Sequence, residues 1–109
     1  MTKVTIRKTK SGDYVSFRCQ GHTGYAEEGE DIVCAGVSAI VINTVNCLQD
    51  LTDAKFTLDY AEDGGDISLK FTDRPGEKAV FLVDCMIHGL KWIRMQYGRE
   101  YLNYEIKEV

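Results

Sequence analysis

Features that commonly assign a small protein to a class are missing from this chain of 109 residues. Its four cysteines form no Cys-x-x-Cys pair, which argues against a zinc site or a thioredoxin-like dithiol. Basic residues are not in excess, since the net charge is −4, and this disfavours a nucleic-acid or anionic-membrane partner. The N-terminal stretch MTKVTIRKTK carries charge but no apolar segment of a signal peptide, so a reducing cytosol and free thiols are expected.

The sequence also has no linker, internal repeat or low-complexity segment, and no run of residues is expected to be apolar enough to span a bilayer. The composition is ordinary for a globular protein, with 44% hydrophobic residues, 28% charged residues and one proline. One domain covering residues 1–109 is therefore expected. A chain of this length buries about two-thirds of its unfolded surface.

Five segments alternate apolar and polar residues, which is the pattern of half-buried strands. They are residues 3–9, 14–20, 55–61, 66–72 and 101–107. Turn-forming residues at 10–13 and 62–65 predict two antiparallel hairpins. Residues 32–51 and 77–97 have helical periodicity instead. The order ββ-α-ββ-α-β predicts an α+β fold, in which an antiparallel-rich sheet is covered by two helices.

The second predicted helix carries two apolar stripes. The first stripe consists of Val80, Val83, Ile87, Leu90 and Ile93, and the second stripe of Phe81, Cys85, His88, Trp92 and Met95. A helix that is apolar on two sides is buried on two sides, and one sheet covers only one of them. Either the first helix covers the second stripe, or this stripe lies in a two-fold homodimer interface.

The loop that precedes the first predicted helix has a histidine at one end and a cysteine at the other. Cys34 is expected in the first helical turn with Asp31 as N-cap, where free backbone N–H groups and the helix dipole stabilise an anion such as a thiolate. The small residues Ala35 and Gly36 would let a peptide approach the sulfur, and the N–H groups could donate to an oxyanion. His22 could act as the base that a cysteine nucleophile needs.

Each of these residues also has a purely structural explanation. Cys34 alone fits a small buried hydrophobe, and His22 alone fits a surface or loop-capping residue. Asp31 can be a simple helix cap or a third catalytic group. Ser38 lies one turn after Cys34 and can be a packing residue or border the site. The acidic residues of the loop, Glu27, Glu28, Glu30 and Asp31, can be a solvated surface. Spacing alone therefore leaves catalysis open.

The stretch GHTGYAEEGEDIVCAGVSAI resembles the signature of the ribosomal-processing cysteine protease family, Prp. The match comprises Gly-His-x-Gly, an acidic glycine-containing loop and Asp-Ile-Val-Cys-Ala-x-Val-Ser. It is carried by Gly21, His22, Gly24, Gly29, Asp31, Cys34, Ala35 and Ser38. The resemblance implies that His22 and Cys34 are catalytic. It also implies a supporting or substrate-binding role for Asp31, Ser38, Gly21, Gly24 and Ala35.

The resemblance further implies an endopeptidase that acts as a cytoplasmic homodimer, without metal, organic cofactor, nucleic-acid partner or membrane partner. Its substrate would be the precursor of large-subunit ribosomal protein twenty-seven, from which it removes an N-terminal extension. The acidic loop would then face a basic protein. Two other classes stay open: a non-catalytic ribosome-associated binding module, and a thiol redox sensor in which Cys34 is oxidised reversibly.

Overall fold

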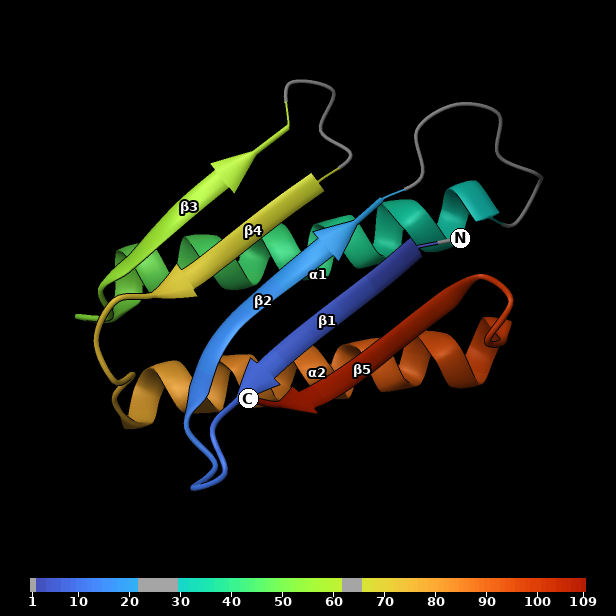
Figure 1. Cartoon of the computed structure of the whole chain (residues 1–109). Coiled ribbons are helices and arrows are strands. Elements are labelled where there is room, and N and C mark those ends of the chain that lie inside the picture. Colours follow the sequence, from blue (N-terminus) through green and yellow to red (C-terminus); the bar gives the residue numbers. More distant parts are fainter. Residues whose placement is uncertain (1, 22–29, 62–65) are drawn as a thin grey trace.

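The structure, a computed structural model, describes residues 2–21, 30–61 and 66–109, with the side chains of residues 30 and 31 excepted. It confirms the α+β fold class and the predicted order of elements, and each predicted element ends within two residues of its expected position. Figure 1 shows one sheet with both helices behind it. The elements are β1 (Thr2–Lys8), β2 (Tyr14–Gln20), α1 (Glu30–Leu51), β3 (Phe56–Tyr60), β4 (Asp66–Phe71), α2 (Glu77–Tyr97) and β5 (Leu102–Glu108).

The sheet has the strand order β3-β4-β2-β1-β5. The pairs β1–β2 and β3–β4 are antiparallel, as the hairpin turns predicted. The pair β2–β4 is also antiparallel, and β5 lies parallel to β1. A parallel pair needs a long crossover, which α2 supplies here. The strands β3 and β5 therefore form the two edges of the sheet.

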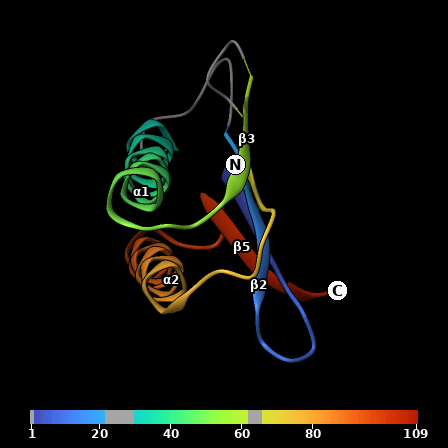
Figure 2. The same cartoon turned by 90° about the vertical axis from the view of Figure 1, so that its left-hand side faces the viewer.

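Both helices pack on the same face of the sheet, α1 over the half that contains β3 and α2 over the half that contains β5 (Figure 2). The core lies between the two layers, because alternate residues of each strand face the helices. Its fully buried members include Val4, Ile6, Phe17 and Leu69 of the sheet, Val37, Val41 and Leu48 of α1, and Val83, Met86 and Leu90 of α2. No helix of the described residues lies on the opposite face of the sheet (Figure 2).

The two helices approach each other at glycines. A Cβ atom added to Gly89 would lie 3.0 Å from Cδ1 of Ile40, and one added to Gly36 would lie 3.6 Å from Cδ1 of Ile93. These contacts identify the side of α1 that faces α2, which matters for the site described below. Glycine lowers the stability of a helix interior, and here it permits close packing.

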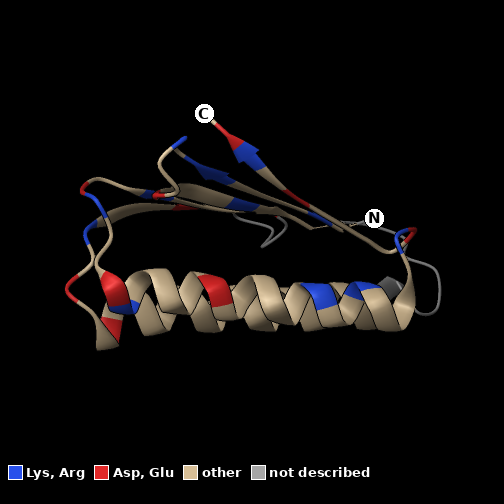
Figure 3. Cartoon of the chain, turned by 90° about the horizontal axis from the view of Figure 1, so that it is seen from below, with Lys and Arg blue, Asp and Glu red and all other residues tan. Residues whose placement is uncertain are grey.

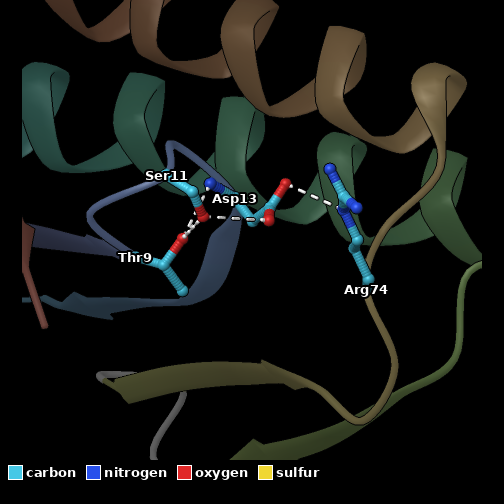
Figure 4. A network of polar contacts seen from close by, with 4 residues as sticks. All are labelled: Thr9, Ser11, Asp13 and Arg74. Carbon is cyan, nitrogen blue, oxygen red and sulfur yellow. Dashed lines mark hydrogen bonds and ion pairs between the residues drawn. The ribbon is translucent and has the colours of Figure 1, made fainter.

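A polar network ties the tip of the β1–β2 hairpin to the segment that leads into α2 (Figure 4). The Thr9 hydroxyl accepts a hydrogen bond of 3.1 Å from the Asp13 backbone N–H. The Ser11 hydroxyl lies 2.9 Å from the Thr9 hydroxyl. The Arg74 guanidinium donates from Nε to the Asp13 carboxylate at 3.0 Å. Because the Arg74 side chain is 80% exposed, we assign this ion pair a positioning role rather than a large stabilising one.

The second apolar stripe of α2 is not covered by α1. Phe81, Trp92 and Met95 are 67%, 58% and 65% exposed, and Cys85 and His88 are exposed as well. The reading in which the first helix covers this stripe is therefore wrong, because α1 contacts α2 through Gly89 and Ile93 instead. Figure 3 shows that charged residues are few along α2. Cys85, which was expected to be buried, is exposed in the single chain.

The expectation that no segment is apolar enough to span a bilayer is wrong for α1. Its segment Ile32–Leu51 has a mean hydropathy of 1.7 and meets the length and composition requirements for a membrane span, whereas no such segment was expected. Core helices of globular proteins meet the same requirements. The residues Val33, Val37 and Val41 pack on the sheet. The side of α1 that packs on the sheet is apolar for this reason, and its exposed side is also uncharged between Asp31 and Asp50.

Candidate active site

The backbone places Cys34 slightly deeper in α1 than the sequence suggested. Because α1 begins at Glu30, Cys34 is the fifth helical residue and starts the second turn rather than lying in the first. Helical side chains tilt toward the N-terminus, so the Cys34 thiol lies over the first turn. The backbone N–H groups of that turn have no partner within the helix. The half-buried thiol therefore stands next to the positive end of the helix dipole.

The predicted N-cap role of Asp31 does not agree with these bounds. The helix already includes Glu30 and Asp31, so Asp31 is a residue of the first turn and does not precede it. The side chain of Asp31 lies outside the described part of the chain. Acidic residues in a first turn are favourable because of the helix dipole. The observed bounds therefore keep two carboxylates at the helix start without assigning either one as the cap.

Cys34 and Ser38 share the flank of α1 that points away from α2. Successive helical residues are separated by about 100°, and Gly36 and Ile40 contact α2. Cys34 and Ser38 lie roughly 120° to 160° around the helix from these two residues. This geometry confirms the expectation that Ser38 lies on the same face as Cys34. Both side chains are half-buried, whereas Ala35 is exposed on the outer side of the helix.

A second thiol, which the sequence analysis did not connect with the site, lies near Cys34. Cys19 faces the helices from the end of β2 and is 3% exposed. Burial, with smaller contributions from the nearby Cys34 and Asp66, raises the pKa of the Cys19 thiol to about 11. Cys19 is therefore protonated at neutral pH and does not compete as a nucleophile. The alternation of β2 already places Cys19 on the inward side, but only the fold brings it near Cys34.

The residues His22, Gly24 and Gly29 lie outside the described residues, so the predicted pairing of His22 with Cys34 stays a prediction. Gly21 follows β2 directly and is half-buried. The end of β2 and the start of α1 lie at the same end of the molecule in Figure 1. The fold therefore fixes both ends of the segment that carries His22 on the side of the molecule where Cys34 lies.

The other histidine is poorly placed to act on Cys34. His88 is exposed on the outer side of α2, where its Nε2 accepts a hydrogen bond of 3.1 Å from Nε1 of Trp92. Cys34 lies on the flank of α1 that points away from α2. Within residues 2–21, 30–61 and 66–109, no group of three or more His, Cys, Asp or Glu side chains could hold a metal ion.

Comparisons with known proteins place the chain among cysteine proteases. The model of the family described as cysteine protease Prp matches residues 1–102. The ribosomal processing cysteine protease Prp of Bacillus subtilis (strain 168) is 37% identical over 101 residues, which cover 89% of this chain and 90% of the relative.

Two solved structures of a protease called Prp from S. aureus, described as an essential ribosomal processing protease, are also similar. The complex with a substrate peptide has a TM-score of 0.90 at 28% identity, covering 98% of this chain and 100% of the other. The complex with a covalently linked product peptide has a TM-score of 0.86 at 29% identity, with the same coverage.

Proposed function

Because the chain belongs to the cysteine protease Prp family and is a cysteine protease, we propose that Cys34 and His22 hydrolyse a peptide bond in a ribosomal protein precursor. The observation that carries the proposal is the position of the Cys34 thiol over the first turn of α1, on the flank free of α2. Of the four cysteines, Cys34 alone combines partial exposure with the start of a helix.

The proposed reaction is acyl transfer through a thioester. His22 accepts the proton of the Cys34 thiol, and the sulfur attacks the carbonyl carbon of the scissile bond. The tetrahedral intermediate then collapses, His22 protonates the departing amine, and the acyl group stays on the sulfur. Water next attacks the thioester, gives its proton to His22 and releases the carboxylate product and the free thiol. The covalently linked product peptide of the S. aureus relative supports an acyl-enzyme route.

The start of α1 suits the charge that develops during this reaction. The tetrahedral intermediate carries a negative oxygen, and unpaired backbone N–H groups at a helix start are donors already aimed outward. We therefore assign the oxyanion contact to these backbone N–H groups. We assign Ser38 to the border of the site, because it lies one turn farther along the same flank.

For the substrate, we propose the precursor of large-subunit ribosomal protein twenty-seven, cleaved after its N-terminal extension in the cytoplasm. The support is the substrate class in the names of the relatives together with the signature at residues 21–40. The net charge of −4 also favours a basic protein as substrate over a nucleic acid.

For assembly, we propose a two-fold homodimer that covers the second stripe of α2. Three large apolar side chains of this stripe are more than half exposed. The adjoining outer side of α1 carries no charge between Asp31 and Asp50. An exposed apolar surface of this kind is typical of an interface, and a two-fold dimer is the commonest assembly. In such a dimer, the second stripe of one copy would pack against the second stripe of the other copy.

The test is incubation with the extended precursor and with a precursor that lacks the extension, followed by mass spectrometry of the products. Wild-type protein should give one N-terminal cleavage in the extended precursor only, and Cys34→Ala should give none while still binding it. Binding without cleavage by the wild type would favour the binding module. Reversible oxidation of Cys34 without any cleavage would favour the redox sensor.

A further inference from the structure

The helix-free face of the sheet carries basic side chains that no step of the proposed reaction uses. Five residues are paired in register across the strands from β5 to β3 and form a basic row, namely Lys107, Arg7, Ser16, Lys70 and Thr57. Their sequence neighbours Ile6, Phe17 and Leu69 are buried against the helices. Because side chains alternate along a strand, the basic row points to the opposite face.

The cations of the basic row are poorly compensated within the described part of the chain. No carboxylate there lies at ion-pair distance from Arg7 or Lys70. Lys107 pairs with Glu105 at 3.4 Å, but Glu105 also pairs with Lys3 at 3.6 Å, so one carboxylate serves two ammonium groups. Arg7 and Lys107 are direct cross-strand neighbours, and like charges in neighbouring strands destabilise a sheet. An anion outside the chain would remove this repulsion.

The acidic side chains of this face lie outside the basic row. Asp66 is held by Arg18 in a two-bonded ion pair. Asp59 belongs to the next row of the same face, where it is paired in register with Ser68. Together with Arg7 and Arg18, Asp59 lines a hollow of about 410 Å³. Asp59 therefore bounds the basic row on one side, and we expect a polyanion to follow the row rather than enter the hollow.

The charge of this face has the opposite sign to that of the chain. The described strands direct five basic and three acidic side chains outward, namely Lys3, Arg7, Arg18, Lys70 and Lys107, and Asp59, Asp66 and Glu105. The whole chain, in contrast, has a net charge of −4. Figure 3 shows basic segments on several strands of the sheet. The total charge, which disfavours a nucleic-acid partner, therefore does not describe this surface.

We propose that the basic row docks the protein on the phosphate backbone of double-stranded RNA. Arg, Lys, Ser and Thr side chains, which make up the row, are the groups that contact phosphates in nucleic-acid complexes. Interfaces between proteins are instead depleted in Lys and centre on aromatic or apolar anchors, and no residue of the row is apolar. A single strand would need aromatic side chains for base stacking, which the row lacks. The choice of RNA rests on the proposed function, since a ribosomal protein assembles with RNA.

The dimensions and position of the basic row are compatible with docking during catalysis. Three strand spacings of about 4.8 Å separate Lys107 from Lys70, a span of about 14 Å. One strand of a duplex presents a phosphate about every 3.4 Å along its axis, so the three cations can each contact a different phosphate. Cys34 belongs to α1, which packs on the other face of the sheet (Figure 2). RNA bound to the basic row would therefore leave the nucleophile accessible to a peptide.

The experiment measures binding of a short fluorescent RNA duplex by anisotropy. With three phosphate contacts, the affinity of the wild type should fall about 40-fold between about 50 and 200 mM salt. The basic-row variant, with Arg7→Gln, Lys70→Gln and Lys107→Gln, should bind about tenfold or more weakly and lose most of this salt dependence. The matched control removes three exposed cations outside the sheet, through Lys78→Gln, Lys91→Gln and Arg99→Gln, and should bind as the wild type does. Asp59→Asn should tighten binding.

Equal affinities of the basic-row variant and its matched control would overturn the proposal. A DNA duplex of the same sequence should bind less tightly, because it lacks the 2′-hydroxyls that Ser16 and Thr57 can contact, and equal binding would overturn the assignment to RNA. Binding of polyglutamate without binding of RNA would assign the face to an acidic protein instead. The basic-row variant should cleave the isolated precursor as the wild type does, which shows that it is folded. Intact RNA binding without any cleavage by the wild type would overturn the proposed function alone.

Discussion

The phenol of Tyr14 donates a hydrogen bond of 2.5 Å to Oδ1 of Asp84, joining the first hairpin of the sheet to the middle of α2. Burial raises the pKa of Tyr14 well above its ordinary value of 10, and the hydrogen bond to Asp84 and its negative charge act in the same direction. The contact connects residues 70 positions apart in the chain, so it helps to hold α2 against the sheet.

The loss of this hydrogen bond should be measurable by denaturant unfolding. Tyr14→Phe keeps the buried ring and removes only the hydroxyl, so we expect a loss of about 1 kcal/mol in the free energy of unfolding. Tyr97→Phe, which alters an exposed ring, is the control and should change nothing. An unchanged unfolding midpoint for Tyr14→Phe would show that water replaces the Tyr14 hydroxyl as the donor to Asp84 without cost.

The raised pKa of Tyr14 also predicts a pH dependence. The unfolded chain releases the Tyr14 proton above about pH 10, whereas the folded protein holds it to higher pH. The stabilisation is thus fully present below about pH 10 and is lost as the pH rises toward the folded value. The free energy of unfolding of the wild type should fall more steeply than that of Tyr14→Phe above pH 10. Parallel pH curves for the two proteins would contradict the assignment.

The two interhelical glycines should respond differently to the same substitution. Gly36→Ala places its methyl group at an ordinary contact distance of 3.6 Å, so the gain in helix propensity of about 0.5–1 kcal/mol should appear in full. Gly89→Ala meets Ile40 at 3.0 Å, and the side chain must shift, so the gain should be smaller or reversed. Ile40→Val removes the contacted Cδ1 and should restore the gain in the double variant. Equal effects at both glycines would disprove the tight contact.

The reactivities of the thiols separate a nucleophile from a merely accessible cysteine. In the Trp92→Asp variant, in which the proposed dimer no longer covers Cys85, accessibility alone predicts that the exposed Cys85 reacts faster with iodoacetamide than the half-buried Cys34. The proposed function predicts the reverse order, because the nucleophile acts together with the base His22. Cys19 should be the slowest, since it is buried and protonated. Mass spectrometry of partially labelled protein gives the order, and faster labelling of Cys85 would count against Cys34.

The catalytic pair should act as one unit. Cys34→Ala and His22→Ala should each remove nearly all cleavage of the precursor peptide, and the double variant should lose little more than either single variant. His88→Ala is the control and should keep near-normal turnover, because His88 lies on the outer side of α2. Strictly additive losses in the double variant, or normal turnover in His22→Ala, would assign the base to another group.

The proposed dimer can be tested at one exposed tryptophan. Trp92→Asp places a charge in the middle of the second stripe, so sedimentation should show a shift from dimer toward monomer. Leu51→Asp, at a comparably exposed site at the end of α1, should leave the mass unchanged. The unfolding free energy of the monomer should hardly change in either variant. A wild type that is monomeric at micromolar concentration would end this proposal.

The sequence alone determined the element order, because alternation along the strands and the helical period of residues 32–51 and 77–97 depend only on the local chain. The same patterns identified the inward stripe of α2, although Met86 also joins the core. The stretch around Cys34 was recognised by its resemblance to a family signature, since the spacing of His22 and Cys34 alone leaves catalysis open.

Only the tertiary structure decided what surrounds those elements. Local patterns do not show which strands pair across the sheet, so neither the nearness of Cys19 to Cys34 nor the basic row on the helix-free face could be predicted. The exposure of the second stripe depended on the side of α2 that α1 contacts, which is set by the close approach at Gly36 and Gly89. The N-cap prediction for Asp31 was wrong for a related reason, because the first turn of α1 extends further than the apolar period that marks the helix in the sequence.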